Sequence, residues 1–344
     1  MSTPDLRPFP HDGTGAGSSA VISGIGTCLP VREISNAALP AELDTSDEWI
    51  RSRTGIAARR IAAPGVSMRD LAVAAGDGAL RSAGRRSVDA LVLATSTPDR
   101  LVPAAAPEVA EGLGQDRIPA FDVSAVCSGF VYALATATGL ITAGIADSVL
   151  VVASEVYSRI VNPLDRDTAV LFGDGAGAVV LRRGGADEQG ALLSFDLGSD
   201  GAGSELIRVP GEAEQPEGPR WFAMAGRKVY LRAIDHMTAS ALHVLKDCAW
   251  TAGSVGALVP HQANARITQA VAQRLGLPPG RALSTLERVG NTAAASIPLA
   301  LAEAQRAGRL RPGDRTVLTA FGAGLTWGSA GLVWPEVTAV HSEL

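Results

Sequence analysis

Apolar runs that alternate with segments of helical spacing dominate the first half of the chain. Such runs predict β-strands at 21–28, 88–94, 120–123 and 148–154. The last of them is apolar throughout, as in a strand covered on both faces of its sheet. Helices are predicted over 68–83 and over 103–113, the second with a proline at its entry, where the missing N–H costs nothing. This alternation predicts an α/β fold with a largely parallel sheet.

The pattern of the first half returns in the second half. Three pairs of segments correspond in the same order: 88–92 with 255–259, 147–152 with 315–320, and 177–180 with 330–333. Each match is weak alone, but their common order predicts a duplicated fold. We therefore predict an N-terminal half over 20–185 and a C-terminal half over 186–344. Residues 1–19, rich in Pro, Gly, Ser and Thr, predict a flexible tail.

Composition limits the classes of function. The chain has 344 residues, 47% apolar and 19% charged, which predicts a globular protein with a large core. Its net charge of −5 argues against a nucleic-acid partner, although a local basic patch for an acidic partner stays possible. No apolar run is long enough to span a membrane and no secretion signal is visible, so we expect a cytoplasmic protein. The three cysteines are widely spaced, which argues against disulfides and a zinc site: Cys28, Cys127 and Cys248.

Cys127 lies where the predicted strand 120–123 gives way to a helix rich in small residues. At the first turn of a helix, unpaired N–H groups and the positive end of the helix dipole favour a thiolate. A strand-to-helix turn also presents a nucleophile well. A lone cysteine, however, is commonly a small buried core residue. On this segment alone both interpretations remain open.

Two further polar residues lie at the ends of predicted strands in the second half. His261 follows the apolar run 255–259 closely, and Asn291 opens a small-residue helix at roughly the place that Cys127 takes in the first half. Taken singly, a core histidine and a helix N-cap are the commoner explanations. Three such groups at corresponding strand ends instead favour a Cys–His–Asn set that faces one cavity.

The glycine cluster 173–177 precedes a strand, so it predicts a tight turn and not a phosphate-binding loop.

Six segments, in this order, carry a family resemblance that covers essentially all of 21–334. They are 44–56 (DTSDEWIRSRTGI), 121–130 (FDVSAVCSGF), 172–177 (FGDGAG), 259–266 (VPHQANAR), 290–292 (GNT) and 321–328 (FGAGLTWG). Together they resemble the β-ketoacyl-acyl-carrier-protein synthase III family of thiolase-fold condensing enzymes. The resemblance implies a thiolase-like five-layer αβαβα fold, built from two similar halves, and a homodimer.

The resemblance also implies roles for the residues at the centre of these motifs. Cys127 would take an acyl group from acyl-CoA, with the amides of Cys127 and Ala323 as the oxyanion hole. His261 and Asn291 would bind the thioester carbonyl of malonyl-acyl-carrier protein during decarboxylation. The product would be a 3-oxoacyl-acyl-carrier protein, in fatty acid or polyketide biosynthesis. No metal and no redox cofactor is expected, since acyl-CoA is the substrate.

Substrate contacts are implied by position in the same motifs. The CoA and pantetheine contacts would be Trp49, Arg53, Arg166, Gly226 and Asn264. The basic surface for the carrier protein would include Arg266 and Arg274. The acyl pocket would be lined by Val102, Leu171, Phe172, Phe222 and Phe321.

An alternative function keeps the acyl-cysteine but transfers the acyl group to a hydroxyl, without decarboxylation. That reaction would tolerate the loss of Asn291, which this chain retains. A thiolase proper would need a second catalytic cysteine near the C-terminus, and Cys248 instead precedes His261. A non-enzymatic partner of a condensing enzyme should have lost the cysteine.

Overall fold

The computed structural model describes residues 18–344. Of the predicted tail, residues 1–17 lie outside the described part. Residues 18 and 19 belong to the first strand, β1 (Ser18–Leu29), which begins earlier than the apolar pattern predicted. Its extra residues pair with the end of strand β7 (Gly175–Gly185), where Ser18 lies opposite Gly185.

Within residues 18–344 the larger sheet has six strands, in the order β14-β1-β7-β6-β4-β5. Its other strands are β4 (Ala90–Ala94), β5 (Ala120–Val123), β6 (Ser148–Glu155) and β14 (Val340–Glu343). The C-terminal strand β14 therefore returns to the sheet of the first half, beside β1. The second sheet has the order β11-β12-β13-β8 in the same described range. Its strands are β8 (Leu192–Ser199), β11 (Ala257–Pro260), β12 (Arg315–Gly322) and β13 (Thr326–Val333).

The two sheets share one pairing pattern, which confirms the predicted duplication of the fold. In the first sheet β4 and β6 are parallel, whereas the pairs β6–β7 and β7–β1 are antiparallel. In the second sheet β11 and β12 are parallel, whereas the pairs β12–β13 and β13–β8 are antiparallel. Three of the corresponding pairs, β4–β11, β6–β12 and β7–β13, are the ones whose sequences resembled each other; the fourth pair, β1 and β8, had no such resemblance.

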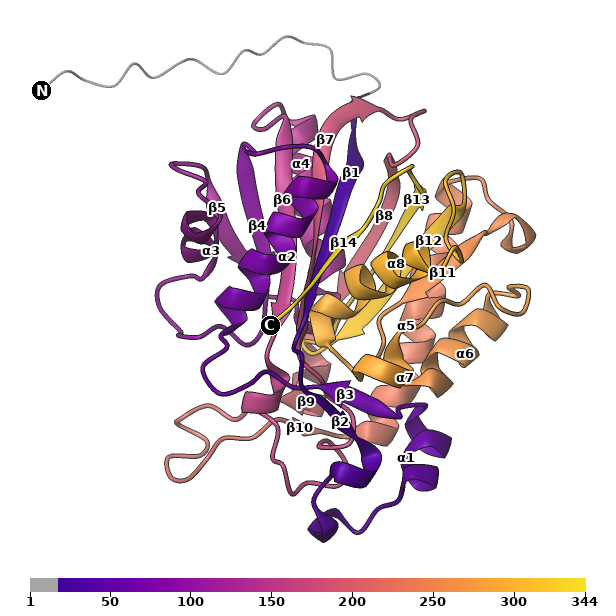
Figure 1. The fold of residues 1–344 in the computed structure, drawn as a ribbon. Coiled ribbons are helices and arrows are strands. Elements are labelled where there is room, and N and C mark those ends of the chain that lie inside the picture. Colours follow the sequence, from indigo (N-terminus) through magenta and orange to yellow (C-terminus); the bar gives the residue numbers. More distant parts are fainter. Residues whose placement is uncertain (1–17) are drawn as a thin grey trace, which may run out of the picture.

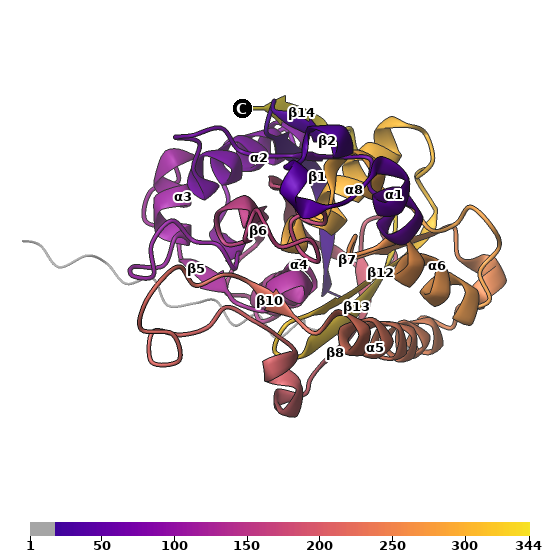
Figure 2. The ribbon, with the colours of Figure 1, turned by 90° about the horizontal axis from the view of Figure 1, so that it is seen from below.

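Helices cover both faces of each sheet and give five αβαβα layers within the described residues (Figure 1). The central layer contains α4 (Gly129–Thr142) and α8 (Ser296–Arg306), each of which contacts strands of both sheets. The outer layers contain α2 (Met68–Ser82) and α3 (Ala106–Gly112) on one side, and α5 (Gly226–Asp247) and α6 (Ala265–Arg274) on the other. Figure 2 shows α4 and α8 between the two sheets.

Short elements complete the fold around the lower end of the sheets in Figure 1. They include α1 (Asp47–Thr54), α7 (Leu286–Val289), the hairpin strands β2 (Glu33–Ser35) and β3 (Ala58–Arg60), and the pair β9 (Ile207–Arg208) and β10 (Ala223–Met224). Two 3₁₀ turns matter for the site: η3 (Val126–Ser128) leads into α4, and η7 (Ala293–Ala295) leads into α8.

The helix predicted over 103–113 begins later, at Ala106. The carboxylate of Asp122 accepts hydrogen bonds from the N–H groups of Ala105 and Ala106 at 2.9 and 2.7 Å. These bonds satisfy the first free amides of the helix, so the helix starts where the carboxylate is and not at Pro103. Pro107, and not Pro103, is the proline of its first turn. The segment before it, with Leu101 and Val102, lies on the surface.

Candidate active site

Cys127 lies in η3, between the end of β5 and the start of α4. The preceding residue, Val126, has a left-handed backbone with φ of 46°, which turns the chain sharply from strand to helix. Gly129 lets this turn pack closely, because a Cβ there would lie 3.1 Å from the Ala94 Cβ. The cysteine is half-buried, and all three cysteines are free thiols. The turn thus places the thiol where the two halves meet.

The two halves repeat this turn, but with a shift relative to the sequence-based expectation. Ala293, in η7, has φ of 45° and stands in the same relation to α8 as Val126 does to α4. By this register the position that corresponds to Cys127 is Ala294. Asn291 corresponds instead to a residue ahead of the first-half turn, so the predicted equivalence was correct only approximately.

Burial, and not the helix dipole, dominates the electrostatics of Cys127. Loss of solvation raises the pKa of the Cys127 thiol well above its ordinary value, and the nearby Glu155 raises it further. The backbone N–H of Cys127 does lower the pKa of the thiol, as expected at a helix start, but burial and Glu155 raise it by more. The net shift is therefore opposite to the sequence-based expectation.

His261 follows β11 and is buried, with 3% of its surface exposed. Its N–H donates to the Thr319 carbonyl at 2.8 Å, which fixes the backbone at the edge of β12. Its Nδ1 lies 2.8 Å from the Ser296 hydroxyl oxygen. Burial lowers the pKa of His261 to about 4, and an interaction with the Ala293 backbone offsets a smaller part of that effect. The ring is therefore neutral near neutral pH.

Asn291 is held by backbone bonds on both sides. Its N–H donates to the Leu171 carbonyl at 2.8 Å, and its carbonyl accepts from the Gly173 N–H at 3.0 Å. Its side-chain oxygen accepts from the Ala293 N–H at 2.9 Å. This leaves the amide nitrogen Nδ2, which makes no hydrogen bond within residues 18–344, as a donor for a ligand.

The end of β12 packs closely against the Cys127 turn. A Cβ at Gly322 would lie 2.9 Å from the Cys127 nitrogen, so the two backbones nearly touch. Within the described residues, neither the Cys127 N–H nor the Ala323 N–H donates a hydrogen bond. Two free amides beside a nucleophile have the composition of an oxyanion hole.

One cavity brings the predicted catalytic residues together. Cys127, His261, Asn291 and Ala323 line a cavity of about 50 Å³, together with aromatic and aliphatic side chains. Three of the residues predicted for the acyl pocket also line it: Phe172, Phe222 and Phe321. Phe172 stacks on Tyr157 with ring centroids 4.6 Å apart, and Phe222 packs against both rings.

A larger cavity of about 550 Å³ adjoins the first, and Asn291 lines both. Among the residues predicted to contact CoA, it is lined by Trp49, Arg53, Gly226 and Asn264. Arg166 lies over the Trp49 ring at 4.4 Å from its centroid, and Arg53 lies at 4.9 Å. These cation–π contacts preassemble the aromatic platform.

Arg266 lines the larger cavity, but other predicted residues lie elsewhere. Arg274 forms an ion pair with Asp235 at 2.5 Å and lines none of the cavities described. Leu171 lines the larger cavity and not the small one beside Cys127. Val102 is 82% exposed, so a single chain does not place it in an acyl pocket.

Asn264 has a structural role beside the predicted one. Its side-chain oxygen caps α6 by accepting from the Arg266 N–H at 2.8 Å, and its amide nitrogen donates to the Arg53 carbonyl at 3.1 Å. It therefore ties α1 to α6 at the wall of the larger cavity. This contact positions both arginines.

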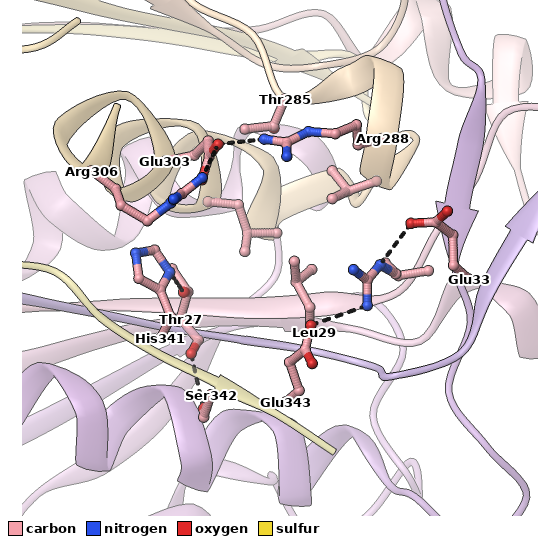
Figure 3. A pocket seen from close by; sticks show the side chains of 13 residues that line it. Thr27, Leu29, Glu33, Thr285, Arg288, Glu303, Arg306, His341, Ser342 and Glu343 are labelled. Atoms are coloured by element: carbon pink, nitrogen blue, oxygen red, sulfur yellow. Dashed lines mark hydrogen bonds and ion pairs between the residues drawn. The ribbon is translucent and has the colours of Figure 1, made fainter. Parts of the chain in front are cut away.

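A third cavity, of about 300 Å³, lies between the C-terminal strand and α8 and contains none of the predicted site residues (Figure 3). Figure 3 shows the Glu303 carboxylate in ion pairs with both Arg288 and Arg306. Arg60 pairs with Glu343 at 3.2 Å. Every arginine of this cavity thus forms an ion pair with a glutamate. The Arg60–Glu343 pair joins β14 to β3, and the Arg288–Glu303 pair joins α7 to α8.

Two polar residues of the site were not singled out from the sequence. Ser296, the first residue of α8, forms a hydrogen bond with the ring of His261. Glu155, the last residue of β6, is fully buried and raises the pKa of Cys127. A carboxylate directly after a wholly apolar strand was the available signal for Glu155.

Within the described residues no cluster suited to a metal ion is present, and no helix is long and apolar enough to cross a membrane.

Family models match both halves of the chain. The 3-oxoacyl-[acyl-carrier-protein] synthase III model matches residues 121–201, and the C-terminal model of the same family matches residues 245–334. The β-ketoacyl-[acyl-carrier-protein] synthase III 5 of Streptomyces coelicolor is 53% identical over 336 residues, which cover 95% of this chain and 100% of that protein. The chain belongs to this synthase III family. The matched ranges contain Cys127, His261 and Asn291.

Solved structures of the synthase III family have the same fold. The 3-oxoacyl-(acyl carrier protein) synthase III of Pseudomonas aeruginosa PAO1 is 52% identical, with a TM-score of 0.89 over 93% of this chain and 99% of that one. The priming β-ketosynthase of the R1128 polyketide biosynthetic pathway is 34% identical, with a TM-score of 0.88 over 96% of this chain and 99% of that one. These similarities confirm the predicted thiolase-like fold.

Proposed function

We propose that this protein primes fatty acid or polyketide synthesis by condensing an acyl group from acyl-CoA with malonyl-acyl-carrier protein. The observation that carries the proposal is the single cavity that Cys127, His261 and Asn291 share, beside the free amides of Cys127 and Ala323. The names of the synthase III relatives and of the priming ketosynthase support the same reaction. The product is a 3-oxoacyl-acyl-carrier protein.

In the first half-reaction Cys127 takes the acyl group. Its sulfur bonds to the thioester carbon, the carbon–sulfur bond to CoA breaks, and the thiol proton ends on the CoA sulfur. The developing oxyanion is placed to accept from the N–H groups of Cys127 and Ala323. Each such donor is typically worth about 2.7–4 kcal/mol.

In the second half-reaction the malonyl group loses CO₂ and leaves an enolate. The neutral His261 ring and the Asn291 amide nitrogen stabilise that enolate by donating hydrogen bonds to its oxygen. The enolate carbon then attacks the acyl carbon, the Cys127 sulfur leaves as a thiolate, and that thiolate takes a proton from solvent. Because the pKa of His261 is lowered to about 4, its donor is a neutral imidazole and not an imidazolium.

The mouth of the larger cavity fits an anionic substrate and an acidic partner. Arg53, Arg227 and Arg266 line it, and none of the three forms an ion pair within residues 18–344. The Trp49 ring would stack on the adenine of CoA. Arg166 now lies over that ring, so the adenine would have to insert between Arg166 and Trp49. Arg266, with Arg274 on the same helix, would contact the acidic carrier protein.

The space around Cys127 favours a short acyl group. The small cavity of about 50 Å³ adjoins another of about 400 Å³, and both are lined by Val126, Phe222 and Ala323. A longer acyl chain would extend into that second cavity, which Leu101 also lines. Leu101 and Val102 are 95% and 82% exposed, and β5 is the edge strand of its sheet. These features support a homodimer that covers the edge and adds to the pocket.

The test separates acylation from condensation. Wild type and Cys127→Ala are incubated with acyl-CoA alone and weighed by intact-protein mass spectrometry, and we expect the acyl adduct only on wild type. His261→Ala and Asn291→Ala should acquire the adduct but release no CO₂ from malonyl-acyl-carrier protein. Acyl transfer to a hydroxyl acceptor without CO₂ would replace the proposed function with the alternative one.

A further inference from the structure

Glu155 is a fully buried carboxylate that only neutral groups contact. It accepts from the Ser96 N–H at 3.1 Å, from the Ser96 hydroxyl at 2.9 Å and from the Thr97 hydroxyl at 2.7 Å. The backbone N–H of Ala294, in η7, also faces the carboxylate and lowers its pKa. The Tyr157 hydroxyl lies 3.1 Å from the Ser96 hydroxyl, and because the latter donates to Glu155, Tyr157 donates in turn to Ser96. No cation is among these partners.

The same groups lead directly to the nucleophile. The turn η7, which contains Ala294, packs against the end of β6 on one side and against η3, which contains Cys127, on the other. A Cβ at Gly129 would lie 3.5 Å from the Ala294 Cβ, so the two helix starts are in contact. One layer of backbone therefore separates the Glu155 carboxylate from the Cys127 turn.

Two negative charges at neighbouring sites in the protein interior are mutually unfavourable. Burial raises the pKa of Glu155 to about 7, in spite of its hydrogen bonds. Ionised Glu155 raises the pKa of Cys127, and both residues, after burial, raise the pKa of Tyr157. The three titrations are thus coupled.

The other charged groups near this network have partners of their own. Arg159, on the 3₁₀ turn that follows β6, forms an ion pair with Asp99 at 2.6 Å. His261 faces the cavity from β11 and is bonded to Ser296. Neither of them contributes a hydrogen bond to Glu155 within the described residues.

We propose that Glu155 is a positioning residue whose charge opposes the ionisation of Cys127: the ionised carboxylate adds to the effect of burial in keeping the cysteine a thiol, and the protonated carboxylate removes that added effect. Glu155 acts through its charge and forms no covalent bond. In acylation the Cys127 proton still ends on the CoA sulfur. The resting enzyme thereby keeps its nucleophile in the form that oxidants attack least. The inference rests on the proposed function only in taking Cys127 as the nucleophile.

The test measures the ionisation of Cys127 without any substrate. Wild type and Glu155→Gln are alkylated with iodoacetamide over a range of pH, and the Cys127 peptide is quantified by mass spectrometry. Near pH 6, where Glu155 is protonated, we expect about equal rates. Above about pH 8 we expect the Gln variant to react about threefold to tenfold faster, because its thiolate fraction is larger although each thiolate is less nucleophilic.

Two variants separate a charge effect from structural damage. Asp174→Asn is the matched control, since Asp174 is also fully buried and also bonded to hydroxyl and amide donors, of Ser158 and Ala62. Its alkylation profile should follow that of wild type. Glu155→Asp keeps the charge and should also keep the slow rate at high pH. Equal profiles for wild type and Glu155→Gln, or a faster rate in the Asp174 control, would overturn the proposal.

A milder variant decides the question if Glu155→Gln does not fold. Ser96→Ala removes a hydrogen bond that stabilises the ionised carboxylate, so more Glu155 is protonated at a given pH. Its Cys127 alkylation should be faster than in wild type near pH 7.5 by about twofold. An unchanged or slower rate would contradict the proposal. Alkylation needs no acyl-CoA, so failure of the proposed acylation would be seen separately.

Discussion

His261 Nδ1 lies 2.8 Å from the Ser296 hydroxyl oxygen, and the same oxygen accepts from the Gln262 N–H at 3.2 Å. Within residues 18–344 the Ser296 hydroxyl has no acceptor other than Nδ1 for its own proton, so that proton points to Nδ1. The hydrogen-bond network therefore assigns the ring proton of His261 to Nε2. That nitrogen is the one available to donate to a thioester carbonyl.

Ser296→Ala should impair condensation much more than acylation. Without the hydroxyl, the neutral ring can hold its proton on either nitrogen, so we expect CO₂ release to fall about tenfold or more while acyl-adduct formation stays nearly unchanged. Stopped assays of both half-reactions measure the split.

The matched control is Ser148→Ala, which removes another buried hydroxyl, bonded to Asp89 at the far end of β6. Both variants should lose about 1 kcal/mol of unfolding free energy. Equal loss of acylation and CO₂ release in Ser296→Ala would show a general structural effect, and not one on the His261 proton.

Gly322→Ala should damage the oxyanion hole. The new methyl group would lie 2.9 Å from the Cys127 nitrogen, so the loop with Ala323 must move away. Loss of one donor of this kind costs about 10²–10³ in rate, and we expect a fall of that order in acylation by acyl-CoA. Gly139→Ala, on α4 with open space around its Cβ, should leave acylation intact and stabilise the helix by about 1 kcal/mol. Retained acylation in Gly322→Ala would remove Ala323 from the oxyanion hole.

That Cys127, His261 and Asn291 share one cavity was predictable from the sequence, whereas the electrostatics of the cavity was not. Cys127 and His261 follow strands of the two sheets, as predicted. Asn291 instead follows the short helix α7, so its predicted place at a strand end was wrong although its place beside the cavity was correct. The thiol pKa depends instead on tertiary burial and on Glu155, whose partners Ser96 and Thr97 are remote in sequence. Local helix-start reasoning therefore captured only the smaller effect on the thiol pKa.

The domain pattern shows the same division between local and long-range information. The repeated strands had sequence echoes, but β14 has no apolar run, because it is an edge strand whose side chains alternate between partial and full exposure. Its place beside β1 depends on long-range pairing and on ion pairs such as that of Arg60 with Glu343. No local pattern in the sequence could indicate it.

His261 and Glu155 should bias the pH dependence of stability in opposite directions. The pKa of His261 is lowered from 6.5 to about 4, so the folded state binds fewer protons than the unfolded state in that window, and stability falls as pH falls. The pKa of Glu155 is raised from 4.5 to about 7, so the folded state keeps its proton there, and stability falls as pH rises. Each effect is about 3 kcal/mol, so they nearly cancel in wild type.

Removing either group should reveal the pH dependence of stability that the other group causes. Between about pH 4.5 and 6.5, the Tm of His261→Gln should decrease with rising pH relative to wild type, and that of Glu155→Gln should increase. Thermal unfolding followed by circular dichroism at several pH values measures both slopes. Parallel slopes for the two variants would show that at least one of these groups titrates normally in the folded protein.

The last prediction concerns Arg266 at the mouth of the larger cavity. Its guanidinium donates to the Ser52 carbonyl at 3.0 Å, and it forms no ion pair within residues 18–344, so its charge is available to a partner. Arg274, on the same helix, is already neutralised by Asp235. The two arginines thus give a matched pair for testing the carrier-protein surface.

Arg266→Glu should raise the KM for malonyl-acyl-carrier protein by about tenfold at low salt, because charges at the rim of an interface act chiefly on association. Arg274→Glu should raise it less, since Asp235 already balances that charge. Added salt should slow wild type but hardly affect Arg266→Glu, whose attraction is already lost. Acylation by free acyl-CoA is the internal control and should change much less. An unchanged KM for Arg266→Glu at low ionic strength would place Arg266 on an ordinary solvated face, and the docking surface would then lie elsewhere on the enzyme.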